Sequence, residues 1–244
     1  MSRYDSRTTL FSPSGRIFQI EYALKAIEKA SSSTAFLATD GIVLLCERRD
    51  QVKLLKAQKG EKLYQVDDHI YTSIAGLSSD ARILLQEARK LAQEYRVKFN
   101  EPIPLERLAE EIADIKQSYT QHGGLRPFGA AFVLFGYDSY LGYQIYQTDP
   151  SGNYAAWKSI SIGKNRTAID PLIKSDYGED MNVDECIKLA LGITLKTADA
   201  SALSPERIEL GIFKNVDGKC EFKLLTDEEM KALCAEFLEN NNKE

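Results

Sequence analysis

Few of the residue types that usually build catalytic or metal sites occur in this sequence. Its 244 residues include only two histidines, four cysteines and one tryptophan. The cysteines are far apart and have no CxxC spacing, which favours reduced thiols in a cytosolic or nuclear protein over a disulfide framework or a zinc site. His69 and His122 belong to no HExxH or other metal-ligand spacing. We therefore predict no metal site.

Long apolar segments and an excess of positive charge are also missing. No apolar run approaches the ~20 residues that span a bilayer, and the first residues lack the apolar segment of a signal peptide. The formal net charge is −5, which argues against nucleic acid or an anionic membrane as the main partner. With 43% hydrophobic and 27% charged residues, the composition is typical of a globular domain with a sizeable core.

Motifs for nucleotide binding and for nucleophilic catalysis are absent as well. The glycine-rich segment 121–129 does not match GxGxxG and does not lead from a strand into a helix. Gly163 and Lys164 lack the upstream glycine of a P-loop. No order of histidine, aspartate and serine supports a catalytic triad. The residues alone therefore predict neither a cofactor nor an active site.

The hydrophobic pattern alternates between groups of strands and helices. Short apolar runs separated by turn residues predict strands joined as hairpins, and apolar residues at a period of 3.6 predict helices. Hairpins imply antiparallel sheets, and the intervening helices imply outer layers, so we expect one domain with an α-β-β-α stack. The expected strands cover 34–38, 42–46, 62–66, 69–75, 130–137, 140–148, 154–162 (one strand or hairpin arm), 206–214 and 219–224. The expected helices cover 17–30, 78–99, 105–119, 165–175, 182–195 and 226–239.

Three of these helices have recognisable capping residues at their starts. Serine, threonine, asparagine and aspartate side chains accept hydrogen bonds from the first N–H groups of a helix, and a glutamate three residues later completes a capping box. The candidates are the segment Ser78–Asp80 and the pairs Asn182/Glu185 and Thr226/Glu229.

The first 30 residues combine three unlike parts. Residues 1–12 are polar and without periodicity, which predicts an extended tail. The segment Ser12–Gly15 predicts a turn, because proline fixes φ near −65° and glycine accepts positive φ. The helix that follows is apolar on more than one face, so it is either a core helix or a helix covered by another chain. Together these parts suggest a device at an assembly surface.

Several motifs follow one another along the chain in a fixed order. They are Phe11-Ser12-Pro13, Gly15-Arg16, Gln19 to Ala23, Asp40-Gly41, Glu61-Lys62, Ala75-Gly76-Leu77, Asp80-Ala81, Tyr119-Thr120-Gln121, Gly123-Gly124, Arg126 to Gly129 and Asp149 to Gly152. With them the chain resembles the α subunits of the 20S proteasome over essentially its whole length. The segment Tyr4–Thr9, with support from Asp114–Gln117 and Ser151–Lys158, is most similar to the alpha type-4 branch at the third ring position.

The resemblance implies the N-terminal-nucleophile hydrolase fold, an α/β layered sandwich of two antiparallel sheets with an added N-terminal helix. Residues 1–12 are then a gate tail, 13–30 the turn and helix, 31–239 the sandwich and 240–244 a disordered tail. The segment Ser31–Phe36 departs from the glycine-containing stretch of relatives.

The resemblance also implies where the ancestral active site lies. In catalytic relatives a free N-terminal threonine is the nucleophile and its own amine is the base. Ser31 occupies that column here, and Glu47 and Lys62 occupy those of the supporting acid and lysine. Because Ser31 lies behind some thirty residues, it has no free amine. We therefore expect no catalytic residue and no peptide hydrolysis by the isolated chain.

What remains is the role of a non-catalytic ring subunit in ubiquitin-dependent and ubiquitin-independent protein degradation, in cytoplasm and nucleus. By resemblance, such subunits form a seven-membered ring with other α-type chains, stack on β-type chains and bind activators through their C-terminal carboxylates. The implied gate residues are Tyr4, Asp5, Ser6, Pro13 and Tyr22. The implied activator-docking residue is Lys62, and the ring-contact candidates are Gly124, Arg126, Pro127 and Phe128.

Other interpretations stay open from sequence alone. The chain could be an active threonine- or serine-type N-terminal-nucleophile peptidase, or a subunit that forms a homoheptamer. Ser6, where most relatives have arginine, favours a specialised place in a mixed ring. The tail could also be plain disorder, and Lys62 could be a surface lysine or a partner of Glu47.

Overall fold

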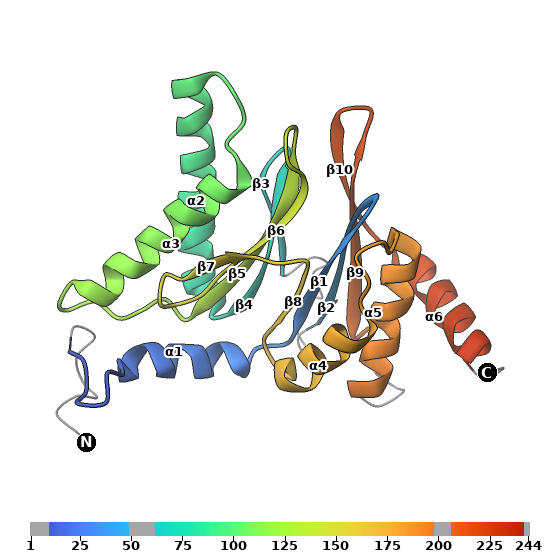
Figure 1. The fold of residues 1–244 in the computed structure, drawn as a ribbon, viewed down its shortest axis with the longest axis horizontal. Coiled ribbons are helices and arrows are strands. Elements are labelled where there is room, and N and C mark those ends of the chain that lie inside the picture. The colour runs from blue at the N-terminus through green and yellow to red at the C-terminus, as the bar shows by residue number, and fades with distance from the viewer. Residues whose placement is uncertain (1–9, 49–61, 198–205, 242–244) are drawn as a thin grey trace.

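Two antiparallel sheets form the centre of the molecule. The computed structural model describes residues 10–48, 62–197 and 206–241. Within them, one five-stranded sheet has the order β10-β9-β2-β1-β8 and the other the order β3-β4-β5-β6-β7 (Figure 1). The strands are β1 (Ser33–Ala38), β2 (Gly41–Glu47), β3 (Leu63–Asp67), β4 (Ile70–Gly76), β5 (Ala130–Asp138), β6 (Gly142–Thr148), β7 (Tyr154–Ala156), β8 (Ser159–Ile162), β9 (Ile208–Val216) and β10 (Lys219–Leu224).

Helices cover the outer face of each sheet, as the predicted α-β-β-α stack requires (Figure 1). Helices α2 (Ser78–Phe99) and α3 (Leu105–Gln121) pack on the β3–β7 sheet. Helices α4 (Arg166–Asp176), α5 (Val183–Thr197) and α6 (Asp227–Asn241) pack on the other sheet. Among the described residues, no helix is both long enough and apolar enough to cross a membrane.

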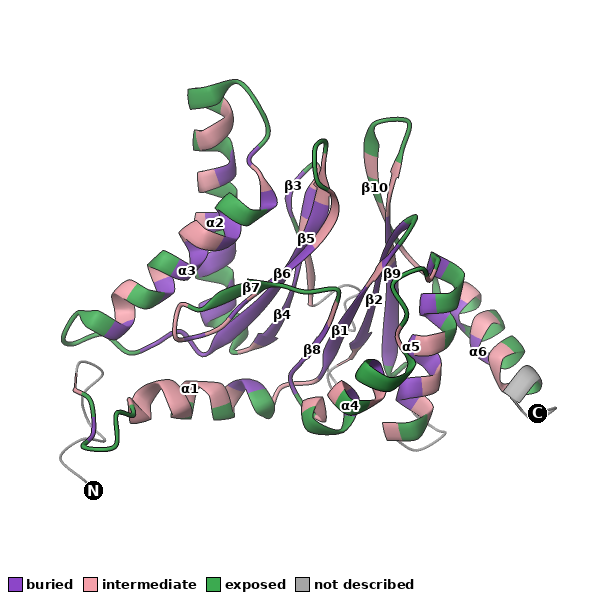
Figure 2. Cartoon of the chain, viewed as in Figure 1, coloured by how far each residue is buried: buried purple, intermediate pink, exposed green. Residues whose placement is uncertain are grey.

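Strand β2 shows why the sheets stack. Its Val43 and Leu45 join the core under α5, whereas Ile42 and Leu44 join the core between the sheets. Successive side chains of a strand point to opposite faces, so an entirely apolar strand must be covered on both. Strand β2 is buried on both faces, as its apolar composition requires, and Figure 2 shows the central strands in the colour of buried residues.

The segment 154–162 forms two strands in different sheets, not one strand. The N–H of Trp157 donates to the carbonyl of Ile145 on β6 (2.9 Å). The carbonyl of the next residue, Lys158, accepts from the N–H of Leu37 on β1 (2.8 Å). The chain therefore passes from one sheet to the other within a single dipeptide.

Two of the three predicted caps are confirmed. At α5, the N–H of Glu185 donates to Asn182 Oδ1 (3.0 Å) and the N–H of Asn182 donates to the Glu185 carboxylate (2.9 Å). The Thr226/Glu229 pair makes the same reciprocal bonds at α6.

The N-cap prediction for α2 was wrong. Leu77 is the N-cap residue and makes no side-chain capping bond, because the carboxylate of Asp80 is bound elsewhere. At the other end of the chain, α6 continues to Asn241, past residue 240 where the tail was predicted to begin.

Candidate functional site

The turn before the first helix is closed by its own main chain. The N–H of Gly15 donates to the carbonyl of Ser12, and the N–H of Ser12 donates to the carbonyl of Arg16, both at 2.9 Å. Ser12 Oγ accepts a third bond from the N–H of Arg16 (3.0 Å). Gly15 has φ of 74°, as the turn prediction requires. Ser12 is buried, whereas Pro13 lies exposed at the tip. The gate candidates Tyr4, Asp5 and Ser6 lie outside the described residues.

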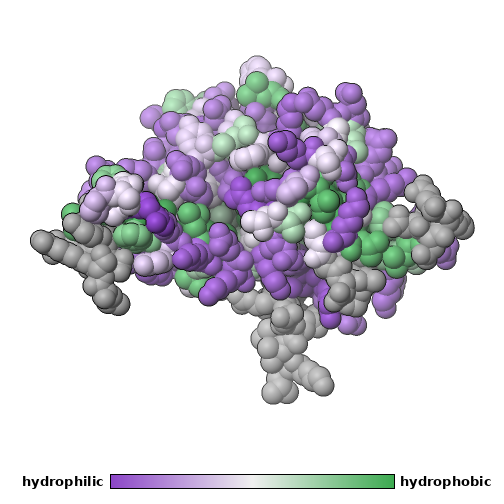
Figure 3. Space-filling view, turned by 60° about the horizontal axis from the view of Figure 1, so that its bottom comes forward, coloured by the Kyte–Doolittle hydropathy of each residue, from purple (hydrophilic) through white to green (hydrophobic). Residues whose placement is uncertain are grey.

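Helix α1 (Phe18–Glu28) lies along one end of the sandwich and is poorly covered (Figure 1). Ile27 is its one buried residue, and its other apolar side chains are half-buried or exposed. Tyr22 is 45% exposed, with the ammonium of Lys25 5.8 Å from its ring centre. Figure 3 turns this end of the molecule forward and shows hydrophobic and hydrophilic side chains interspersed on it. A single chain therefore leaves α1 accessible to a neighbour.

The link between α1 and β1 carries Ser31, the residue that the resemblance assigns to the ancestral nucleophile column. The Lys62 ammonium donates to the main-chain carbonyls of Ser31 and Ser32, the latter at 3.0 Å. Glu47 binds the same link through its main-chain N–H, which donates to Ser32 O (2.9 Å), and through its carboxylate, which accepts from Ser32 N (3.3 Å). Lys62 and Glu47 thus meet at Ser31 and Ser32, and they hold main-chain atoms.

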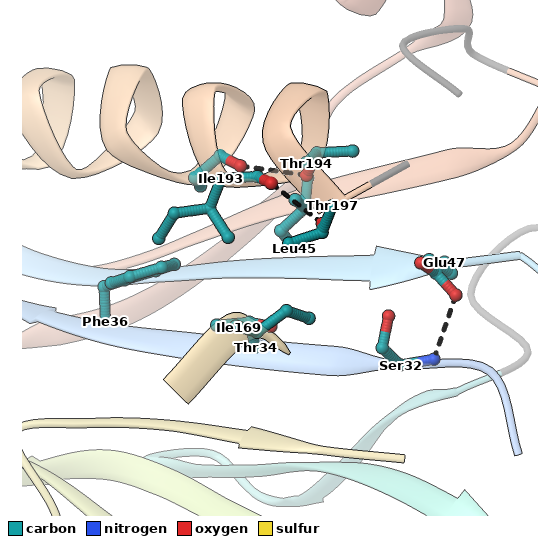
Figure 4. A pocket seen from close by; sticks show the side chains of 10 residues that line it. Ser32, Thr34, Phe36, Leu45, Glu47, Ile169, Ile193, Thr194 and Thr197 are labelled. Atoms are coloured by element: carbon teal, nitrogen blue, oxygen red, sulfur yellow. Dashed lines mark hydrogen bonds between the residues drawn. The ribbon is translucent and has the colours of Figure 1, made fainter. Parts of the chain in front are cut away.

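Among the described residues, the cavity beside this column is too small to hold a substrate. Figure 4 shows the Glu47 carboxylate turned toward the N–H of Ser32 beside a narrow cavity under α5. That cavity holds about 10 Å³, room for roughly one water molecule. Burial raises the pKa of the neighbouring Cys46 thiol to about 11, although the nearby Lys62 charge opposes the rise, so this thiol is protonated near neutral pH.

The loop that holds the ring-contact candidates is fixed to the start of α2. The Arg126 guanidinium donates to both carboxylate oxygens of Asp80, at 2.6 and 2.8 Å, and the N–H of Gly129 donates to the same carboxylate (2.9 Å). The bond from Arg126 holds the pKa of the Asp80 carboxyl below its usual range. Sequence reasoning missed this role of Asp80, although the Asp80-Ala81 motif pointed to the residue.

The four ring-contact candidates are not equally accessible. Phe128 is buried and packs its ring against Tyr119, with centroids 4.4 Å apart, and Pro127 is buried beside it. Gly124, with φ of 87°, and Arg126 lie on the surface. The loop therefore presents Gly124 and Arg126 outward, while Pro127 and Phe128 anchor it from within.

Comparison with known proteins places this geometry in a family. Residues 27–213 match the model of proteasome subunits, and residues 4–26 match the N-terminal signature of proteasome subunits of type A. The chain belongs to the proteasome subunit family. Its sandwich and its N-terminal turn and helix thus correspond to two separately recognised parts of one family.

The relatives place the chain on the alpha side of the proteasome family. It is 48% identical to proteasome subunit alpha type-3 of Saccharomyces cerevisiae, over 94% of this chain and 90% of the relative. It is 44% identical to proteasome subunit alpha type-4 of Spinacia oleracea, over 96% and 94% respectively. The alpha type-4 subunit of Petunia hybrida is 43% identical, over 95% and 93%.

These matches confirm the predicted class. The chain is a non-catalytic alpha-ring subunit of the proteasome, a threonine-type peptidase complex, and the reading as an active peptidase is set aside. Alpha-type proteasome subunits assemble into rings with other alpha-type and beta-type subunits. The half-covered α1 is consistent with such an assembly, because a neighbouring subunit could cover the apolar side chains that this chain leaves partly exposed.

Proposed function

We propose that this chain gates substrate entry into the proteasome core particle with its N-terminal tail. The observation that carries the proposal is the closed turn Ser12–Gly15 at the start of an exposed helix. Such a turn gives the preceding residues a fixed origin. The twelve residues 1–12 can extend ~40 Å at ~3.3 Å each, far enough to run from the ring surface toward a central axis.

Residue chemistry assigns roles within the tail. Tyr4 and Asp5 offer a hydroxyl and a carboxylate that neighbouring tails bind by hydrogen bond and ion pair. Ser6 replaces the arginine usual in relatives, so the tail makes asymmetric contacts in a ring of different α chains. Pro13, at the exposed tip of the turn, and Tyr22, exposed on α1, set the direction in which the tail leaves the ring.

Lys62 is the proposed docking residue for activators. An ammonium group is a compact point charge that suits a single carboxylate, such as the C-terminus of an activator chain. Its side chain is half-buried and held at the C-terminal end of α1, next to the surface that a ring neighbour would cover. Gly124 and Arg126, exposed on the loop beyond α3, are the proposed contacts to a ring neighbour.

The proposed cellular role of this chain is that of the proteasome particle to which it belongs. We assign the chain to the cytoplasm and nucleus, in ubiquitin-dependent and ubiquitin-independent degradation. The four free cysteines are compatible with this assignment.

Deleting residues 2–10 tests the gate. The assembled core particle that contains the shortened chain should hydrolyse a fluorogenic peptide faster than the wild-type particle without any activator, because one strand of the closed gate is missing. Native mass spectrometry of the deletion particle, which should contain the same set of subunits as the wild-type particle, is the control for altered assembly. Unchanged basal hydrolysis in a fully assembled deletion particle would rule out a gating role.

Lys62→Ala tests docking. The particle should bind an activator with a C-terminal carboxylate about tenfold or more weakly, as expected when a charge-assisted hydrogen bond is lost. Lys29→Ala, which removes an exposed charge at the end of α1, is the matched control. Equal activator affinity in the wild-type and Lys62→Ala particles would show that Lys62 of this subunit does not bind the activator.

A further inference from the structure

We infer that Lys62 and Glu47 form a clamp that fixes the direction of α1, so that the remains of the ancestral active site now position the gate. The hydrogen bonds of the clamp are independent of the proposed gating function. Only the effect of the clamp on the tail rests on that proposal. The clamp consists of Lys62, Glu47 and the link Lys29–Ser32, which joins α1 to β1.

The main-chain carbonyls of the link are held from two sides. Lys62 donates to the carbonyls of Ser31 and Ser32, and the N–H of Glu47 donates to that of Ser32. On the opposite side, the N–H of Lys164 donates to the carbonyl of Ala30 (2.7 Å). Every carbonyl from Ala30 to Ser32 is therefore bonded to a segment distant in sequence.

The lysine has a rigid base and a favourable electrostatic position. The carbonyl of Lys62 accepts from the N–H of Ile74 on β4 (3.0 Å), which fixes the backbone from which the side chain extends. Its ammonium lies beside the C-terminal end of α1, where the helix dipole favours positive charge.

Close packing leaves the link little space to move. A Cβ added at Gly163, whose φ is 92°, would lie 2.7 Å from the carbonyl oxygen of Ser31 and 2.9 Å from that of Ala30. The backbone after β8 therefore touches the link directly. With Glu47 of β2 on one side of the link and Gly163 after β8 on the other, the link has one well-defined path.

That path decides where the tail begins. Ile27, the last residue but one of α1, is the buried residue of the helix, so α1 is packed most deeply at its C-terminal end. An eleven-residue helix is ~16 Å long at ~1.5 Å per residue, and a tilt of about 10° at the link moves its start by about 3 Å. The turn Ser12–Gly15 lies just beyond that start, so loosening the clamp displaces the origin of the tail.

Hydrogen exchange of the purified core particle, followed by mass spectrometry, tests the clamp without any activator. Lys62→Met should make the amides of Ser32, Glu47 and Lys164 exchange roughly 5- to 30-fold faster, as expected when one or two hydrogen bonds are lost. Lys62→Arg retains a cationic donor and should restore slow exchange, and Lys90→Met, an exposed lysine on α2 outside the clamp, is the matched lysine control. Unchanged exchange in Lys62→Met, or no rescue by Lys62→Arg, would overturn the clamp.

Basal peptide hydrolysis then tests the consequence for the gate. Lys62→Met should raise it in particles with the full tail and add nothing in particles that lack residues 2–10. If deletion alone raises hydrolysis but Lys62→Met does not, the clamp does not set the tail's direction and the inference is overturned. If deletion has no effect, the gating proposal fails by itself, while the exchange measurement still decides whether the clamp exists.

Discussion

Helices α1 and α3 both contact the β3–β7 sheet, yet they depend on this chain to different degrees. Helix α3 buries seven of its 17 residues, whereas α1 buries one of its 11. The core of α3 is complete within one chain, and the apolar faces of α1 are not. Helix α3, which is covered within this chain, contributes to the stability of the chain itself. Helix α1, which is only half covered, contributes to assembly with a neighbouring subunit.

The largest expected effect is on stability, and it tests the contrast between α3 and α1 directly. Ile112→Ala, in the buried face of α3, should lower the free energy of unfolding of the isolated chain by about 2–5 kcal/mol, because it leaves a cavity in a packed core. Ile20→Ala, on the half-buried face of α1, should cost less than about 1 kcal/mol in the same urea titration. In ring assembly the order should reverse, with Ile20→Ala impaired. Equal unfolding costs would contradict the contrast.

A second prediction concerns a charge inside the α3 core. Lys116 is fully buried, and its ammonium donates to Thr148 Oγ1 (2.7 Å) and lies 5.1 Å from the ring centre of Phe132. Burial lowers its pKa to about 7, below the unfolded value of about 10.4. The unfolded chain therefore binds more protons between these values, and wild-type stability should rise with pH across that range.

Lys116→Met should remove this rise and stabilise the isolated chain at pH 7 by on the order of 1–4 kcal/mol, less what the lost bond to Thr148 contributed. Urea unfolding at several pH values between about 7 and 10 measures both effects. Lys90→Met, an exposed lysine on α2, is the control. A wild-type stability that is flat over this range would contradict the buried-charge explanation.

The smallest effect is expected at the loop that borders the two regions. Asp80→Asn keeps an acceptor for the N–H of Gly129 but loses the ion pair with Arg126, so it should cost about 1–2 kcal/mol at pH 7. Because the fold lowers the pKa of Asp80, its contribution is present above the unfolded value of about 3.9 and is lost as pH falls through the folded value. The difference between variant and wild type should therefore shrink at about pH 2–3, and a constant difference would contradict the ion-pair explanation.

Sequence predicted the features that depend on neighbours along the chain. The capping boxes at α5 and α6 join residues three positions apart, and the double burial of β2 follows from its own composition. Contacts between residues far apart in the sequence could not be predicted. Asp80 was read as a cap because Arg126 lies 46 positions away, and Lys116 gave no sign that it would be buried against Thr148.

The candidate site follows the same rule. The turn Ser12–Gly15 and the helix after it are local, so both were predicted from their residues. The resemblance brought Ser31, Glu47 and Lys62 together, but not the fact that Lys62 and Glu47 bind main-chain atoms of the link. Every residue type has a main-chain carbonyl, so a hydrogen bond to one requires no particular residue at that position. Such a bond therefore cannot be predicted from the sequence pattern.

The dipeptide Trp157–Lys158 has a consequence for which substitutions the fold tolerates. Its two bonds, to Ile145 on one sheet and to Leu37 on the other, use an N–H and a carbonyl that almost every residue type supplies. Side chains at these two positions are thus free to vary without loosening the connection between the sheets. Proline at residue 157 is the exception, because it lacks the N–H. The sandwich can therefore keep its alignment while sequences at this crossing diverge.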